Sequence, residues 1–280
     1  MKKISCALAF ATAAVVSGPA SAVIVGGIDF GTLGATQHLE TSTLAETLVT
    51  KVGDTLQGYG VVSTVNGSSS YCAPGPCALY YYFTGYTVTA FNGQQVQFTG
   101  GTVNIYYSSS GPINLLSQNS LANIATITGL TPWAGLTGHT FADAIFALNP
   151  GMGPTQTLNG SGTLTGATLS ENGAGLLDVN SGFGMAAVDA YLNGNSIADS
   201  LGGFADIALT SSSNNFVLNP FDVSSGLAAG CQTGMAPSGN WCLQGTLNTR
   251  GAVAVVTEPG TLALVGLALF GAGMSRRKRV

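Results

Sequence analysis

The sequence predicts an all-β protein: an antiparallel β-sandwich-like body with turns rich in Gly, Asn and Ser, a cleavable N-terminal signal peptide and a single C-terminal hydrophobic helix. Three observations predict this. Short runs of β-branched and aromatic residues alternate with turn signals such as Asn-Gly. Charged residues make up only 7% of the chain while 40 of its 280 residues are glycine, so amides and hydroxyls are expected to cover the solvent face. An apolar segment with basic residues beside it stands near each end.

The N-terminal segment has the three regions of a signal peptide. Two lysines precede an apolar run over 4–16, and Ala20 and Ala22 frame a site of the small-x-small type. Signal peptidase is therefore expected to cut after Ala22. This divides the chain into a leader over 1–22 and an exported body over 23–256.

The first half of the body predicts strands and tight turns. A first strand is expected over 23–30, and residues 35–49 predict either a short helix or a threonine-rich strand. Residues 53–67 predict a strand that runs into an Asn-Gly turn. The stretch that follows is rich in tyrosine and predicts a meander of paired strands, over 79–91, 94–98 and 102–107.

The second half continues this pattern after a break. Residues 112–154 are expected to be irregular, and strand signals resume over 155–179. The alternation then extends to the end of the body, over 176–191, 207–209, 216–218 and 244–256. Many short strands with few helical periods favour a β-sandwich or a related all-β fold. The sequence shows no exact internal repeat, so it does not support a solenoid.

Four cysteines remain after the leader is removed, and the oxidising export route favours disulfides. Four cysteines allow three pairings. We expect Cys72 to pair with Cys77 and Cys231 with Cys242, because each pair brackets a turn-rich loop. A zinc site is the alternative, but no C-x-x-C pair occurs in the sequence.

Residues suited to catalysis are sparse in the body. His38 and His139 are its imidazole bases, and the sequence contains no G-x-S-x-G motif. Glycoside hydrolysis needs a pair of carboxyl groups. The glutamates of the body are Glu40, Glu46 and Glu171, so an aspartate would have to supply the partner. The sequence therefore predicts no catalytic residue and no cofactor.

Two further patterns concern binding. Asp178 and Asn180 imitate part of a calcium loop, but Phe183 stands at the loop's glycine position, so Asx turns are the alternative and no metal site is predicted. Four aromatic residues are candidates for stacking on sugar rings: Tyr80, Tyr82, Tyr86 and Trp133. Packing on a sheet face is the alternative for the tyrosines, because aromatic residues are favoured in strands.

The C-terminal segment is typical of a transient membrane anchor. A proline and a glycine within 257–260 precede an apolar helix over 261–274. Residues 275–280 then contain four cations, Arg276, Arg277, Lys278 and Arg279. Cations after an apolar helix stay cytoplasmic, so the body faces away from the cytoplasm. The apolar helix spans about 21 Å, less than a hydrocarbon core of roughly 30 Å, which suits a transient anchor better than a permanent membrane helix.

The residues Thr257, Glu258, Pro259 and Gly260, with the apolar run and basic end after them, closely resemble the PEP-CTERM sorting signal of Gram-negative bacteria. Thr257 stands where the family pattern has its first proline. The resemblance implies processing by a membrane-embedded exosortase near Glu258 and Pro259, in bacteria that export polysaccharide and build biofilm or floc. It also implies a transient anchor in the cytoplasmic membrane, followed by release to the cell surface or extracellular matrix.

A second resemblance lies within the body. The motifs GDTLQGYG at 53–60 and GLLDVNSG at 175–182, with the cysteine loop at 72–77, look like those of flocculation-associated PEP-CTERM proteins. The role that this resemblance implies is to hold cells and exopolysaccharide together. The matching residues are turn-like and structural, so they name no catalytic set.

The body is strongly acidic. Two of the eight Lys and Arg lie in the leader and four in the tail, which leaves Lys51 and Arg250, whereas eleven of the twelve Asp and Glu remain. The net charge over 23–256 is therefore about −9. Such a surface lacks the cations that neutralise phosphates, so no nucleic acid partner is expected.

These patterns predict a non-enzymatic exported protein of the cell surface or extracellular matrix, associated with exopolysaccharide, biofilm or floc. The expected partners are signal peptidase, an exosortase-type enzyme, the cytoplasmic membrane, and exopolysaccharide or matrix. An exported polysaccharide-binding module is the first alternative. A hydrolase of matrix glycans and an ice-binding protein are further alternatives, although the Thr-x-Thr pairs are spaced too unevenly to form a flat lattice.

Overall fold

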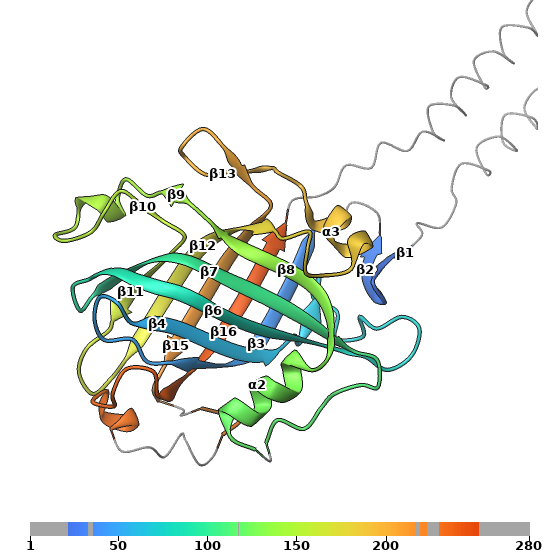
Figure 1. Ribbon diagram of the computed structural model, residues 1–280, viewed down its shortest axis with the longest axis horizontal. Coiled ribbons are helices and arrows are strands. Elements are labelled where there is room, and N and C mark those ends of the chain that lie inside the picture. Colours follow the sequence, from blue (N-terminus) through green and yellow to red (C-terminus); the bar gives the residue numbers. More distant parts are fainter. Residues whose placement is uncertain (1–21, 33–35, 117, 217–218, 223–229, 252–280) are drawn as a thin grey trace, which may run out of the picture.

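The computed structural model describes five parts of the chain, residues 22–32, 36–116, 118–216, 219–222 and 230–251 (Figure 1). The leader before Ala22, the sorting motif, the apolar run and the basic tail lie outside the described residues. Parts of the expected strands at 216–218 and 244–256 lie outside them as well. Within the described residues, no helix is long and apolar enough to cross a membrane.

One antiparallel sheet forms the body of the molecule, and its neighbouring strands follow the order β12, β15, β16, β3, β4, β6, β7 (Figure 1). The strands are β3 (Gln37–Thr47), β4 (Thr55–Val61), β6 (Ala78–Phe91), β7 (Gln95–Ser108), β8 (Thr131–His139), β11 (Leu158–Thr163), β12 (Ser170–Val179), β15 (Ile207–Asn214) and β16 (Trp241–Gly251). The short β5 (Thr64–Val65) pairs with β3.

The sheet closes on itself because β8 and β11 together fill the place between β7 and β12. Leu158 of β11 pairs with Phe98 of β7 on one side and with Gly175 of β12 on the other. Leu136 of β8 pairs in the same way with β7 and with Val179 of β12. These two strands together occupy the eighth position of a closed barrel.

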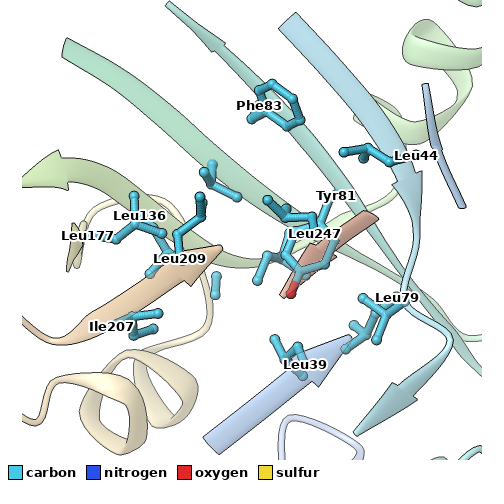
Figure 2. Packing of buried hydrophobic residues seen from close by; sticks show 14 of the residues in the cluster. Leu39, Leu44, Leu79, Tyr81, Phe83, Leu136, Leu177, Ile207, Leu209 and Leu247 are labelled. Carbon is cyan, nitrogen blue, oxygen red and sulfur yellow. The ribbon is translucent and has the colours of Figure 1, made fainter. Parts of the chain in front are cut away.

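The barrel interior is filled by apolar side chains. Successive residues of a strand point to opposite faces, so Leu79, Tyr81 and Phe83 of β6 point inward while Tyr80 and Tyr82 point outward. Figure 2 shows the inward residues of β6 meeting leucines from β3, β8, β12, β15 and β16. The interior is therefore a packed core rather than a channel.

A second apolar cluster lies outside the barrel, where α2 (Ser120–Thr128) covers the outer face of β4, β6 and β7. Tyr59, Tyr80 and Tyr106 pack there against Ile127 of the helix. The helix begins after Asn119, whose side-chain oxygen accepts a hydrogen bond from the backbone N–H of Ala122.

The two ends of the barrel are covered differently. At one end, α3 (Ala186–Leu192) packs with the hairpin of β1 (Ala22–Val25) and β2 (Ile28–Thr32). The other end carries the 3₁₀ helix η2 (Cys231–Thr233) and a small cluster that includes Leu48, Leu169 and Leu243. The remaining short elements are β9 (Phe141–Ala142), η1 (Phe146–Leu148), β10 (Thr155–Gln156), β13 (Ile197–Ala198) and β14 (Phe204–Ala205).

The all-β prediction is confirmed, and the structure adds that one continuous sheet closes into a barrel where a sandwich-like arrangement was expected. The undecided segment at 35–49 contains the strand β3. The expected strands at 94–98 and 102–107 are one long strand, β7. These differences concern pairing between distant segments rather than the local preference for extended backbone.

Three local expectations are wrong. The segment 23–30 is a hairpin rather than one strand, because Gly26 and Gly27 adopt φ of 57° and 80° and turn the chain. The segment 112–154 is not irregular throughout, since it contains α2 and β8. The segment 176–191 is a strand only up to Val179, the end of β12. Its last residues belong to α3, which packs against β1 and β8.

Candidate functional site

Two glutamates from different strands meet inside the barrel. Glu46 lies near the end of β3 and Glu171 near the start of β12, with β16 and β15 between them. Glu46 is only 2% exposed and Glu171 is partly exposed, and the inward positions of the same two strands include Leu44 and Leu177. The Ser213 hydroxyl donates a hydrogen bond to Oε1 of Glu171 at 3.0 Å and also stabilises the charged form of Glu46.

Glycines make room for the two carboxyl groups. A Cβ atom added at Gly245 of β16 would lie 3.4 Å from the carboxyl carbon of Glu46. A Cβ atom added at Gly160 of β11 would lie 3.3 Å from Oε2 of Glu171. Larger side chains at these positions would press on the carboxyl groups, so the two glycines and a serine create a polar layer within the apolar core.

The surroundings of the pair favour its protonated form. Burial raises the pKa of Glu46 well above its ordinary value and the charge of Glu171 raises it further, while the hydrogen bond with Ser213 acts in the opposite direction. Burial likewise raises the pKa of Glu171, again opposed by Ser213. Among the described residues, Oε2 of Glu46 and the Tyr86 hydroxyl have no hydrogen-bond partner. Such a perturbed pair is a candidate functional site.

The space beside the pair is small. A cavity of about 10 Å³ is lined by Glu46, Tyr86 and Ser211 among apolar neighbours. A second, of about 20 Å³, reaches Glu171 and Ser213 from the end of the barrel that carries η2. A water molecule needs roughly 10–15 Å³, whereas pockets for organic ligands measure some hundreds of Å³. The pair therefore has room for water but not for a sugar ring, which argues against glycoside hydrolysis at this place.

The third glutamate of the body lies on the outer surface. Glu40 is on β3, like Glu46, but faces outward with its side chain 37% exposed. Its Oε1 atom lies 3.5 Å from Nε2 of His38, and its carboxylate accepts a hydrogen bond from the Thr64 hydroxyl. Burial lowers the pKa of His38, with Glu40 raising it and Arg250 lowering it.

The other histidine, His139, is held between two aspartates. Its Nδ1 atom lies 2.7 Å from Asp178 and its Nε2 atom 3.2 Å from Asp199, so both ring nitrogens are occupied. Burial lowers the pKa of His139, but the hydrogen bonds and charges of the two aspartates outweigh it and the pKa is raised. The ring thereby links β12 to the hairpin of β13 and β14, and a structural role follows from this arrangement.

The aromatic candidates for sugar stacking are mostly buried. Tyr80, Tyr86 and Trp133 are at most 1% exposed and present no open ring face, which corrects that expectation for these three. Tyr86 points into the barrel, Tyr80 lies beneath the segment that leads to α2, and the Trp133 indole donates a hydrogen bond to the Gly26 carbonyl at 3.0 Å. Tyr82 is partly exposed on the outer face, where its hydroxyl donates to Gln57 at 3.4 Å.

The calcium candidates do not converge. Asp178 faces His139, while Asn180 accepts a hydrogen bond from the N–H of Gly182, as an Asx turn requires. In the part of the chain that the structure describes, no group of three or more His, Cys, Asp or Glu side chains is placed to hold a metal ion.

Both predicted disulfides are present. Cys72 bonds to Cys77 and Cys231 to Cys242, as the local pairing required. The second bond lies at the barrel end with Leu48, Leu169 and Leu243, which also line the cavity that reaches Glu171. The bond thereby ties residues 230–240, the covering segment at this end of the barrel, to β16.

Fold and site together define a β-barrel with a closed, filled interior. Residues 255–279 match the family model described as the PEP-CTERM protein-sorting motif, so the predicted sorting signal is confirmed. This motif implies export in a Gram-negative bacterium, processing by an exosortase and association with the membrane. No curated protein and no solved structure matches the chain.

Sequence reasoning named Glu46 and Glu171 as separate glutamates but did not bring them together. A signal was present: each stands at an inward position of a strand whose neighbouring inward positions are Leu or Gly. The register across β16 and β15 brings together two residues that are 125 positions apart in the sequence (171 − 46), and a pattern within one strand does not contain it.

Proposed function

We propose that this protein is a non-enzymatic component of the cell surface or extracellular matrix, associated with exopolysaccharide, biofilm or floc. The observation that carries the proposal is the sorting motif at 255–279, which follows within a few residues of Gly251, the end of the last barrel strand. The barrel is then the cargo that the motif delivers. The release of the barrel to the surface or matrix rests on the exosortase step.

The contacts of the reactive side chains support a passive role. His139 uses both ring nitrogens to hold two aspartates, and Glu46 and Glu171 lie in a core with room for water only. A catalytic base must reach a substrate within hydrogen-bond distance, which these contacts hinder. We therefore assign the described body a structural or binding function rather than a chemical one.

A polysaccharide-binding module is the second candidate, favoured by the outer face of β12, β15 and β16. Among the outward residues there, the register places three uncharged hydrogen-bonding side chains in one row, those of Asn172, Ser212 and Thr246. The hydroxyls of Ser212 and Thr246 lie 2.9 Å apart. Neutral amides and hydroxyls suit an uncharged glycan, whereas a body of net charge about −9 would repel an anionic one.

Retention on a column of the host's own exopolysaccharide tests these candidates. The variant Asn172→Ala with Thr246→Ala is expected to elute earlier than the unmodified protein, while Thr99→Ala, an exposed hydroxyl on β7, is the matched control. Equal retention of all three proteins would remove this face from the proposal. Loss of polymer mass during contact would indicate a hydrolase and contradict the non-enzymatic assignment.

The matrix role is tested in cells. Deletion of the gene is expected to reduce floc or biofilm formation, and expression of the full chain from a plasmid is expected to restore it. Unchanged matrix formation in the deletion strain would contradict the proposal, whatever the column shows.

A further inference from the structure

The glutamate pair inside the barrel faces no positive charge within the described residues. The four basic side chains there are Lys51, in a loop beside Asp54, His38 and Arg250, on the outer face, and His139, between its two aspartates. The elements packed around the pair contribute apolar groups, serines, threonines and glycines, and the one other titratable group among them is Tyr86. The described residues therefore supply no cation that would form an ion pair with the carboxyl groups and neutralise them.

We propose that Glu46 and Glu171 form a proton-binding site, which holds at least one proton at neutral pH and loosens the disulfide-tied end of the barrel when that proton is lost. This goes beyond the proposed surface role and does not depend on it. The site takes no organic ligand, because the adjoining cavities hold about 10 and 20 Å³.

The supply of hydrogen-bond donors supports one bound proton. The Ser213 hydroxyl has a single hydrogen, and it donates to Glu171 at 3.0 Å. Oε2 of Glu46 and the hydroxyl of Tyr86 lack partners among the described residues, and both residues line the same small cavity. Two ionised carboxylates would leave adjacent negative charges in a region of low polarity, where the described residues make one hydrogen bond to them, from Ser213. A proton on one of them removes that repulsion.

The position of the pair explains which part of the barrel would respond. The cavity that reaches Glu171 and Ser213 is also lined by Leu48, Leu169 and Leu243. The same leucines pack with the disulfide between Cys231 and Cys242. Ionisation of both carboxyl groups would draw water into this apolar contact, so the covering segment is expected to open first.

The sign of the pH dependence follows from the direction of the pKa shifts. Burial raises both pKa values above those of unfolded glutamate, so the folded state binds the proton more tightly. The stabilisation is complete below the unfolded pKa and is lost as the pH rises through the folded pKa. For one proton, the unfolding equilibrium constant increases by up to about tenfold per pH unit in that window.

Urea unfolding of the full chain in detergent, between pH 5 and 9, tests the proposal. Glu46→Gln and Glu171→Gln are expected to raise the midpoint at pH 8 and to flatten its fall with pH. Glu40→Gln, on the same strand but facing outward, is the matched control and should keep the unmodified slope. His139 titrates in part of this range, so the readout is the difference between each variant and the unmodified protein. A Glu46→Gln slope equal to that of the unmodified protein would overturn the proposal.

A spectroscopic measurement keeps the test independent of folding effects. With ¹³C-labelled glutamate carboxyl groups, the infrared band of a protonated carboxylic acid is expected in the unmodified protein at pH 7. It should be absent from Glu46→Gln or Glu171→Gln and present in Glu40→Gln. Absence of the band from the unmodified protein would overturn the proposal. A rise in the unfolding midpoint with millimolar calcium at pH 8, lost in Glu46→Gln, would also overturn it, because the pair would then be a cation site.

Discussion

Tyr80, Tyr81 and Tyr82 are consecutive in β6 and lie in three different environments. Tyr81 lies inside the barrel and its hydroxyl forms a hydrogen bond with Thr249 at 2.9 Å. The hydroxyl of Tyr80 accepts a hydrogen bond from the N–H of Ile113 at 2.7 Å, beneath the segment that leads to α2, and Tyr82 is partly exposed. Burial raises the pKa of Tyr80 and of Tyr81. Residue type alone therefore does not distinguish a packed tyrosine from one that could bind a ligand.

His139 provides a prediction about a single titration. Because its hydrogen bonds to Asp178 and Asp199 raise its pKa, the histidine is expected to titrate above 6.5 in an NMR pH titration of the full chain. Asp178→Asn is expected to lower that pKa, because it removes a charge and an acceptor. The stability contributed by the charged ring is complete below the unfolded pKa and is lost as the pH rises through the folded one.

His38 serves as the internal reference for this titration. Its pKa is lowered, chiefly by burial, and Asp178→Asn should leave it unchanged. A His139 pKa at or below 6.5 in the unmodified protein would contradict the hydrogen bonds of His139 with the two aspartates. The same spectra report whether the variant keeps its fold, since all other resonances should stay in place.

The pairing of β8 and β11 with their shared neighbours brings backbones unusually close. Where the two strands meet, a Cβ atom added at Gly138 would lie 2.2 Å from the carbonyl oxygen of Gly100 and 2.9 Å from the side chain of Thr157. The Thr157 hydroxyl donates to that same carbonyl at 2.8 Å. Glycine at 138 is therefore required by the junction that closes the barrel.

Gly138→Ala is expected to lower the free energy of unfolding by about 1–3 kcal/mol, the usual cost of an added group in a packed site. Urea unfolding of the full chain measures this loss. Gly182→Ala is the matched control, because the nearest atom to a Cβ there is Oδ1 of Asn180 at 3.6 Å. Equal stability of the two variants would indicate that the junction is looser than described.

The two disulfides are expected to differ in their effect because they close loops of different length. Cys231 and Cys242 are 11 residues apart and Cys72 and Cys77 are 5 apart. Replacement of Cys231 and Cys242 by serine should lower the free energy of unfolding by about 2–3 kcal/mol, and the corresponding change at Cys72 and Cys77 by less. Unfolding of each double variant under oxidising conditions measures both effects. A larger loss at the shorter loop would contradict the entropic argument.

Both described ends of the chain lie at the same end of the barrel. Gln37 pairs with Gly251 at the end of β16, and its side chain donates a hydrogen bond to the carbonyl of Tyr191 in α3, which packs against β1. The sorting motif therefore follows the end of the barrel that α3 and the first hairpin cover (Figure 1). The end with η2 and its disulfide is the opposite one.

Processing of the tail is testable by the intact mass of the protein from cells with and without the exosortase. With the enzyme, a species that lacks the residues beyond about Glu258 is expected outside the cytoplasmic membrane. Pro259→Ala should accumulate the uncut chain, and Thr261→Ser, a small change next to the motif, is the control. An uncut chain in the membrane under both conditions would contradict the processing step.

Much of the fold could be predicted from local pattern. The alternation in residues 79–91 predicts β6, and the short loops between cysteines predict both disulfides, because neighbouring residues decide these features. The helix α2 was missed since its nine residues carry too short an apolar period. The glutamate pair was missed because its members come from strands far apart in the chain.

Local chemistry is enough to specify a strand, a turn, a sorting tail and a cysteine pair, because each depends on residues close together in the chain. Closure of the sheet depends on β8 and β11 meeting β7 and β12 in register, and that register is a property of the folded chain. It also decides which side chains are enclosed. Folding thus buries Tyr86 and Trp133, and it brings Glu46 and Glu171 together beside Ser213, where we propose that they share a proton.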